Sequence, residues 1–159
     1  MTSTTSDRAG ATSRHRPDDR PVLAVVFDDA TVTPVLDRAA TAAGVLDVPL
    51  TVALLHPRDG FSTDAALLAR TTRRRRQRLQ TLLAGLRQST GLQPVGVLLP
   101  YGWRPRRSRQ RMFARLVAAK ARGCEARLVV IPVTLGGTAA RLPVPAIVVD
   151  SSTASTPEA

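Results

Sequence analysis

Residues 21–29 read PVLAVVFDD and residues 35–43 read VLDRAATAA, and these two stretches indicate the fold. The run from Val22 to Phe27 is entirely apolar and is followed by two aspartates. A continuous apolar run that ends in turn residues is typical of a strand buried on both faces, as in parallel sheets. The second stretch repeats apolar residues at helical spacing, and the helix is expected to end between Gly44 and Leu46.

The rest of the chain alternates further strand-like and helix-like segments. Strands separated by helices imply right-handed crossovers and a parallel sheet with helices on both faces. We therefore predict a Rossmann-like α/β domain, a doubly wound five-stranded parallel sheet in the order 3-2-1-4-5. Only Pro132–Pro143 joins the last two strands, so we expect a truncated last crossover of one or two helical turns around Thr138–Arg141. The further strands are expected at 50–55, 95–99, 127–131 and 144–149, and the further helices at 64–89 and 106–122.

The composition suits one folded domain. The chain has 159 residues, of which 43% are hydrophobic and only 3% aromatic, so Ala, Val and Leu are expected to fill the core. Residues 1–20 and 151–159 are nearly free of large apolar side chains. We expect two disordered tails around a folded domain at 21–150.

The sequence also favours a cytoplasmic protein. No apolar run approaches the ~20 residues that span a bilayer, and the first 20 residues lack the apolar centre of a secretory signal, so no membrane association is expected. Cys124 is the one cysteine, which excludes an internal disulfide framework and a cysteine-cluster metal site. A single thiol fits a reducing compartment.

The sequence lacks two nucleotide-binding motifs, and it lacks residues that response-regulator receivers require. A dinucleotide-binding fold needs GxGxxG after the first strand, where glycines admit the pyrophosphate, but residues 28–31 read DDAT. The sequence has no GxxxxGK[ST] phosphate loop either. The acidic pair Asp28-Asp29 is typical of response-regulator receivers, but these need an Asp after the third strand and a Lys after the fifth. Residues 98–101 read LLPY, and the only lysine is Lys120, inside a predicted helix.

Several short motifs, taken in order, resemble the universal stress protein family. VLDRAATAA at 35–43 is similar to the family's ALDRAAELA, and LLHP at 54–57 to its LLHV. AKARGCEARLVVI at 119–131 is similar to AKERGADLIVVG, and VPAIVV at 144–149 to CPVLVV. The resemblance covers about residues 21–150. It implies a non-catalytic protein of stress response or regulation, dimeric through the last strand at 144–149.

One departure from the family concerns ATP. Its ATP-binding members carry GxxG, nine residues and G[ST] after the fourth strand, so that backbone amides wrap the phosphates. Here residues 132–141 read PVTLGGTAAR, and the nine-residue spacer does not fit before the last strand. We therefore expect no cofactor, and ATP with Mg²⁺ only if the site survives.

A few polar residues are candidates for ligand contact. An acidic pair at the carboxyl end of the first strand lies where doubly wound sheets bind ligands, although it equally suits a helix cap and a solvated loop. A histidine ends the second strand. It is a candidate base or ligand, or it is simply a half-buried residue at the end of the strand. Two glycines and a threonine after the fourth strand are placed to cup one anion or to form a simple tight turn. These candidates are Asp28, Asp29, His56, Gly136, Gly137 and Thr138.

Arginine dominates the charge of the chain. The formal net charge is +11, and residues 65–123 contain no Asp or Glu. Such a surface predicts an anionic partner. The alternative to a stress-type function is therefore a nucleic-acid or other polyanion-binding module on the same scaffold. A GC-rich codon bias also explains the arginines. Tyr101 and Trp103 are placed to stack on bases. The candidate polyanion contacts are Arg73, Arg74, Arg75, Arg76, Arg104, Arg106, Arg107 and Arg109.

Two geometric expectations follow for these clusters. The two Arg-bearing helices should lie on opposite faces of the sheet, which gives two patches and not one groove. Four consecutive arginines spread around a helix at ~100° per residue, so Arg75 should lie near the apolar stripe and extend its charge to water. The sequence shows no nucleophile and base pair, and we do not expect an enzyme.

Overall fold

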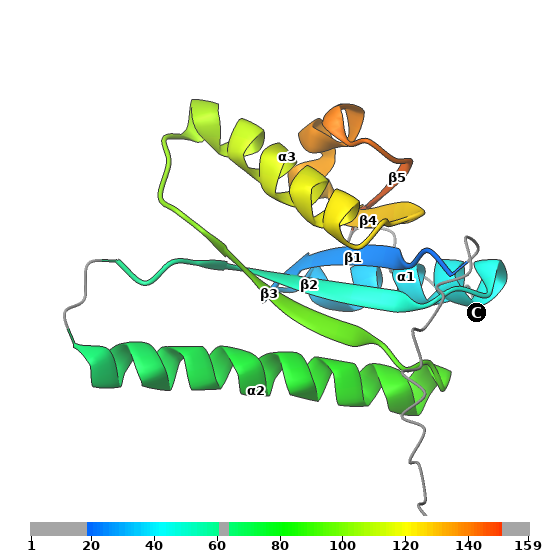
Figure 1. Cartoon of the computed structure of the whole chain (residues 1–159), viewed down its shortest axis with the longest axis horizontal. Coiled ribbons are helices and arrows are strands. Elements are labelled where there is room, and N and C mark those ends of the chain that lie inside the picture. Colours follow the sequence, from blue (N-terminus) through cyan, green and yellow to red (C-terminus); the bar gives the residue numbers. More distant parts are fainter. Residues whose placement is uncertain (1–18, 61–63, 151–159) are drawn as a thin grey trace, which may run out of the picture.

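Five strands form one parallel sheet in the order β3-β2-β1-β4-β5, with helices on both faces (Figure 1). The arrangement comes from a computed structural model that describes residues 19–60 and 64–150. The predicted α/β class and strand order are confirmed. The strands are β1 (Val22–Phe27), β2 (Leu50–Pro57), β3 (Val95–Tyr101), β4 (Leu128–Pro132) and β5 (Ala146–Val149), and the helices are α1 (Val32–Leu46), α2 (Ala65–Thr90), α3 (Arg106–Gly123) and the 3-10 helix η1 (Val133–Arg141).

The two predicted tails fall almost entirely outside the described residues; of them only Asp19 and Arg20 are described. The domain boundaries therefore stay a prediction. Within 19–60 and 64–150, no helix is both long and apolar enough to cross a membrane.

The first strand lies at the centre of the sheet, as its apolar run predicts. It pairs in parallel with β2 and with β4, and Val22 is opposite Leu50 on one side and Leu128 on the other. The five residues before Phe27 are completely buried. Burial on both faces explains why this strand shows no alternation of apolar and polar residues.

Successive side chains of each strand point to opposite faces, and each face has its own core. Val22, Ala24 and Val26 pack with α1 and with the leucines of α2. Leu23 and Val25 pack with α3 and η1. The expectation that the two Arg-bearing helices cover opposite faces is therefore confirmed.

Only the carboxyl-terminal part of α2 packs on the sheet. Its buried residues are Leu79, Leu83 and Leu86. A Cβ atom at Gly96 of β3 would lie 2.7 Å from Cδ1 of Leu83 and 2.9 Å from Cδ2 of Leu79, so the glycine admits the close approach of the helix. The amino-terminal half of α2 extends toward the end of the molecule where β3 ends (Figure 1).

The structure corrects three details of the expected elements. Both β2 and β3 run two residues further than predicted, because His56 pairs with Pro100 and Pro57 with Tyr101. Since β3 is an edge strand, a proline is tolerated there: its missing N–H need not face a neighbour. The last strand is two residues shorter than predicted, and the last crossover begins directly after β4 as nine residues of 3-10 helix, longer than the predicted one or two turns.

Candidate functional site

A hollow of about 510 Å³ opens at the carboxyl edge of the sheet, on the face covered by α3. Parallel strands end at the same edge, so loops that are distant in sequence meet there. The hollow is lined by residues at the ends of β1, β2 and β3, in the first turns of α3 and at the start of η1. Its lining residues are Phe27, Pro57, Arg58, Tyr101, Gly102, Trp103, Arg104, Arg109, Phe113, Thr134 and Leu135.

Three aromatic rings form one wall of this hollow. The ring centroids of Phe27 and Tyr101 are 6.3 Å apart, those of Phe27 and Phe113 5.6 Å, and those of Tyr101 and Phe113 5.0 Å. All three pairs are edge-to-face, the arrangement that the ring quadrupoles favour. The rings hold one another in place and present a fixed apolar surface.

The aromatic residues are concentrated here to an unusual degree. The whole chain has three Phe, one Tyr and one Trp, and four of these five line the hollow. Trp103 is 84% exposed, so this large ring gains little from burial in the protein itself. An exposed indole beside an apolar concavity is placed to stack on a flat ligand.

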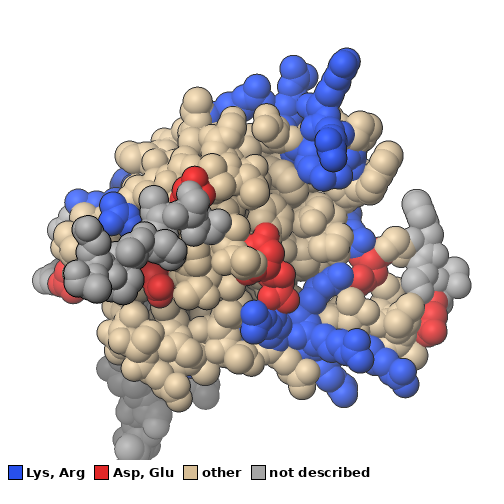
Figure 2. Space-filling view, turned by 180° about the vertical axis from the view of Figure 1, so that it is seen from behind, with Lys and Arg blue, Asp and Glu red and all other residues tan. Residues whose placement is uncertain are grey.

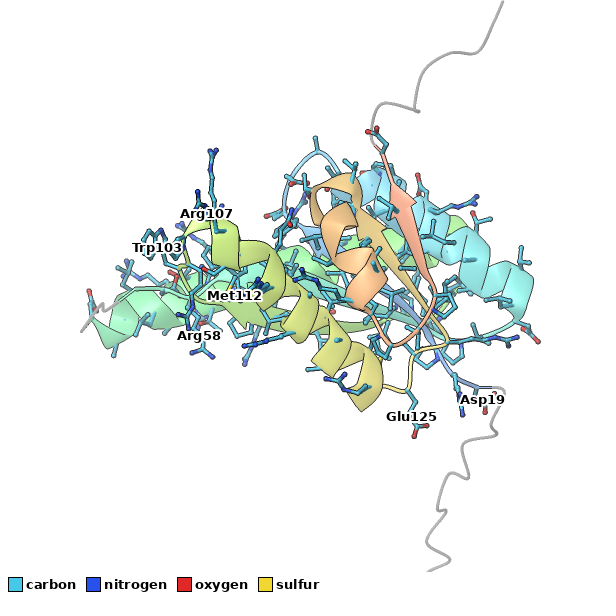
Figure 3. The ribbon with its side chains drawn as sticks, turned by 90° about the horizontal axis from the view of Figure 1, so that it is seen from above. Asp19, Arg58, Trp103, Arg107, Met112 and Glu125 are labelled. Carbon is cyan, nitrogen blue, oxygen red and sulfur yellow. The ribbon has the colours of Figure 1, made fainter. Side chains whose placement is uncertain are left out.

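Arginines surround the aromatic wall. Arg58, Arg104 and Arg109 line the hollow, and no described residue of the lining is Asp or Glu. The backbone N–H of Arg58 donates to the carbonyl oxygen of Tyr101 at 2.7 Å, which fixes the loop after β2 beside β3. Figure 3 shows Arg58 and Trp103 at the same end of the molecule as Arg107 and Met112. The amino-terminal end of α3 adds the positive end of its helix dipole.

The predicted acidic pair lies outside this hollow. Phe27 points to the α3 face, so the next residue, Asp28, is directed to the opposite face, where its Oδ1 accepts from Nε of Arg78 at 2.8 Å. Oδ1 of Asp29 accepts from the backbone N–H of Thr31 at 2.8 Å and from its hydroxyl at 2.6 Å. Both carboxylates have partners in the protein, and a ligand role for them stays a prediction.

The predicted histidine is not among the lining residues, although the next residue, Pro57, is. His56 is half-buried, and its Nδ1 is 3.0 Å from the carbonyl oxygen of Pro57, to which it donates as the Nδ1–H tautomer. Leu54, two residues earlier, belongs to the core under α1 and α2. The alternation along β2 therefore directs His56 to the face opposite the hollow.

The glycines and threonine after β4 are part of η1. Thr138 is completely buried, and its hydroxyl donates to the carbonyl oxygen of Leu135 at 2.7 Å. A Cβ atom would lie 3.4 Å from Cγ1 of Val148 at Gly136, and 3.1 Å from Nε2 of Gln110 at Gly137. The two glycines thus allow η1 to pack closely on β5 and α3; that they also bind an anion stays a prediction.

The arginine clusters lie at one end of the molecule, in two groups separated by acidic and uncharged surface (Figure 2). Arg75 has the predicted position near the apolar stripe, with a side chain only 19% exposed. We expected its guanidinium to extend to water. Instead, Nη1 and Nη2 donate to the two carboxylate oxygens of Asp59 at 2.9 and 2.8 Å. The other candidate polyanion contacts are all exposed: Arg73, Arg74, Arg76, Arg104, Arg106, Arg107 and Arg109.

Neither a reactive thiol nor a metal centre is apparent in the described part of the chain. Burial raises the pKa of Cys124 despite the opposing effect of Lys120, so the thiol is a poor nucleophile at neutral pH. Residues 19–60 and 64–150 contain no group of three or more His, Cys, Asp or Glu that would hold a metal ion.

Sequence reasoning missed several residues of the hollow, among them Phe27, Arg58 and Phe113. One signal was available, because aromatic residues are scarce in this chain and Phe27 ends a predicted strand at the carboxyl edge of the sheet. Phe113 and Arg58 carry no such signal, since only the fold places them beside Tyr101.

Comparison with known proteins places the fold among universal stress proteins. The sequence matches no protein-family model and no curated protein. The structure is similar to that of a universal stress protein family member from Burkholderia pseudomallei, with a TM-score of 0.60 and 18% identity over 85% of this chain and 98% of that one. It is also similar to a universal stress protein from Archaeoglobus fulgidus in complex with dAMP, with a TM-score of 0.53 and 23% identity over 81% of this chain and 95% of that one.

A third solved structure, a universal stress protein in complex with cAMP, has a TM-score of 0.58 and 14% identity over 82% of this chain and 96% of that one. The chain therefore has the universal stress protein fold over nearly the full length of these neighbours. It shares few of their residues, so its ligands have to be inferred from its own side chains.

Proposed function

We propose that this chain is a non-catalytic regulatory protein of the universal stress type that binds an anionic ligand with a flat apolar part in the aromatic hollow. The observation that carries the proposal is the gathering of four of the five aromatic residues of the chain with three arginines at one strand edge. Arginine side chains replace the missing glycine loop as the groups that neutralise the anion. The lining offers no general base, and its only side-chain hydroxyl groups are those of Tyr101 and Thr134, which supports a binding role over catalysis.

The chemistry of the hollow suits a nucleotide or another phosphorylated aromatic compound. A flat ring stacks on the aromatic wall and on Trp103, while a guanidinium binds phosphate through paired N–H donors. The dAMP and cAMP complexes of two structural neighbours contain ligands with both features. Because guanidinium groups supply the positive charge, binding in this way requires no magnesium.

A thermal-shift titration of the full chain tests this function. A ligand that binds only the folded protein raises its melting temperature by mass action. We expect AMP and ATP to stabilise the protein in moderate salt, and tripolyphosphate, which lacks a ring, to stabilise it only in low salt. An equal shift with all three that fades in salt would contradict a specific site.

Two variants localise the effect. Arg109→Gln removes a charge from the lining of the hollow, and Arg115→Gln removes the same charge from an exposed position on α3 outside it. We expect the first to abolish most of the shift with AMP and the second to keep it. An unchanged shift with Arg109→Gln would place the ligand elsewhere.

The assembly of the protein belongs to the same proposal. We place it in the cytoplasm as a homodimer that joins through β5, within the predicted segment 144–149. That strand is an edge of the sheet, and its Val148 is 42% exposed. An uncovered apolar edge is an aggregation hazard that a dimer removes. Light scattering that gives a monomer at micromolar concentration would overturn this part.

A second function is favoured by a different observation. Four arginines of α2 (Arg70, Arg73, Arg74 and Arg76) are exposed and form no ion pair with any described residue. They support a polyanion-binding module, such as a nucleic-acid binder, on the same scaffold. Its mark is a steep loss of affinity with salt.

A further inference from the structure

The arginines of α2 divide into two groups with different surroundings. Arg75 and Arg78 face the body of the protein and pair with Asp59 and Asp28 at 2.8 Å. Codon bias supplies arginine without regard to position. The two inward-facing arginines of α2 nevertheless each form an ion pair with a carboxylate. The outward-facing members are Arg70, Arg73, Arg74 and Arg76, and among the described residues none of them has an acidic partner.

Three of the four outward arginines form a stripe opposite the buried face, whereas Arg76 lies beside that face, about 20° from Leu83 around the helix axis. At ~100° per residue, Arg70, Arg73 and Arg74 fall within an arc of about 100°. The buried leucines of the same helix lie on the opposite side of its axis. The exposed positions that follow the stripe are filled by Gln77, Gln80, Thr81 and Ala84, so no negative side chain interrupts it.

This stripe is unfavourable for the isolated protein. Arginines three and four residues apart on a helix repel one another. No described carboxylate offsets the repulsion on this face. A polyanion bound along the stripe would remove the penalty.

The shape of the region restricts the polyanion. The first buried residue of α2 is Leu79, so the segment Ala65–Arg78, about 21 Å long, is mostly exposed. Figure 2 shows the arginine-bearing end of this helix standing out from the body. A helix of ~10–12 Å diameter fits the major groove of B-form DNA, which is ~12 Å wide.

The projecting segment is also held rigidly. The carboxylate of Asp64 accepts from the backbone N–H groups of Ala66 and Leu67 at 2.9 and 3.2 Å and caps the helix. The ion pairs of Arg75 and Arg78 fix the helix to the loops after β2 and β1. A preformed helix loses little conformational entropy on binding.

We propose that the projecting segment Ala65–Arg78 of α2 docks in the major groove of duplex DNA, where its outward arginines bind backbone phosphates and Gln77 faces the base edges. This inference rests on the second of the two functions proposed above and names its ligand. Duplex RNA fits less well because its major groove is deep and narrow. Single strands are bound through stacked aromatic rings, and α2 contains no aromatic residue.

Fluorescence anisotropy with the full chain and a labelled DNA duplex two helical turns long tests the inference. The test variant replaces Arg70, Arg73, Arg74 and Arg76 by Gln. Each phosphate contact contributes about 0.9 to the slope of log affinity against log salt, so the slope should fall by about 3 to 4 between about 50 and 200 mM salt. The affinity in moderate salt should fall by about tenfold or more.

A matched variant controls for total charge. Replacing Arg111, Arg115 and Arg122 of α3 and Arg127 after it by Gln removes the same charge from exposed positions that are not candidate polyanion contacts. We expect it to keep most of the affinity and of the salt slope. Equal losses in the two variants would mean attraction to net charge and would overturn docking through α2. Circular dichroism and melting temperature establish that both variants fold.

Measurements with single-stranded DNA, duplex RNA and AMP distinguish failure of this inference from failure of the proposed functions. Tighter binding of single-stranded DNA or duplex RNA than of duplex DNA would overturn groove docking and leave a polyanion-binding protein. No binding to any of the three would remove the second function as well. An unchanged AMP thermal shift in the α2 variant would show that the hollow is independent of this surface.

Discussion

The arginines of α2 and those around the start of α3 come from one acid-free stretch of sequence, yet the fold gives them different settings. The α3 group stands beside a concave aromatic wall, where Arg104 and Arg109 line a hollow of about 510 Å³. The α2 group stands on a projecting helix that contains no aromatic residue. The two settings suit different anions, a compact ligand at the aromatic hollow and an extended polymer along the helix.

The largest expected effect comes from the aromatic wall. Phe113→Ala removes a ring that is only 6% exposed and contacts Phe27 and Tyr101. We expect the free energy of unfolding in urea to fall by about 3–5 kcal/mol, and the AMP thermal shift to disappear. Phe113→Leu is the control, since it keeps most of the volume and should cost much less stability. Retained AMP binding in the Ala variant would separate the wall from the ligand.

The next effect concerns the attachment of α2. Gly96→Val places side-chain atoms where Leu79 and Leu83 now lie within 3 Å of the Cβ position. Overpacking of this kind should lower the free energy of unfolding by about 1–3 kcal/mol in urea denaturation.

Gly85→Ala on α2 provides the opposite case. A Cβ atom there meets nothing within 4 Å, so alanine should stabilise the helix by about 0.5–1 kcal/mol. If Gly96→Val were as stable as the parent protein, the helix would not depend on close approach to β3.

A third change separates the position of α2 from its charge. Asp59→Asn leaves the half-buried Arg75 without its carboxylate partner and should cost about 1–2 kcal/mol of unfolding free energy. The substitution raises the net charge by one, so attraction to net charge alone predicts tighter binding of duplex DNA. Loosening of the helix predicts weaker binding, which is the result we expect in anisotropy.

Asp37→Asn serves as the control for this charge change. Asp37 is exposed on α1, and its side chain contacts no other described residue through an ion pair. The variant should leave stability within about 0.5 kcal/mol of the parent. Tighter DNA binding in both variants would favour net charge over positioning.

The smallest effect on stability is expected at the exposed indole. Trp103→Ala should change the free energy of unfolding by less than about 0.5 kcal/mol, because the side chain is 84% exposed. The affinity for AMP should nevertheless fall about tenfold, as expected when one stacking surface is lost. Trp103→Tyr keeps a ring and should retain most of the affinity. Duplex DNA binding should be the same in all three proteins. Any loss in the Ala variant would mean that the hollow and the α2 arginines act as one binding surface.

Much of the fold could be predicted from local patterns. The apolar run at 22–27 indicated a strand buried on both faces, and the alternation of segments gave a parallel sheet of the correct order. Strand ends were less predictable, since Pro100 was expected to stop a strand that continues to Tyr101. The ladder between β2 and β3 decides this boundary, and a ladder involves residues that are distant in sequence.

The candidate site was predictable only in part. Arg104 and Arg109 were identified from charge, but Phe27 and Phe113 are 86 residues apart (113 minus 27) and meet only in the folded sheet. Asp28 and Asp29 follow the carboxyl end of β1, as expected, and a ligand role for them stays a prediction. One step along a strand reverses the direction of a side chain, so Phe27 enters the hollow and Asp28 turns to Arg78.

The sequence by itself determined the periodicity, the order of the elements and the excess of positive charge, because each depends on residue types and their spacing. Only the tertiary structure decided which arginines are paired, which aromatic rings meet and which helix end projects. Those outcomes depend on contacts between segments far apart in the chain. Asp59 makes Arg75, one arginine of a run of four, a structural group, whereas its neighbours in the run are exposed and form no ion pair with any described residue.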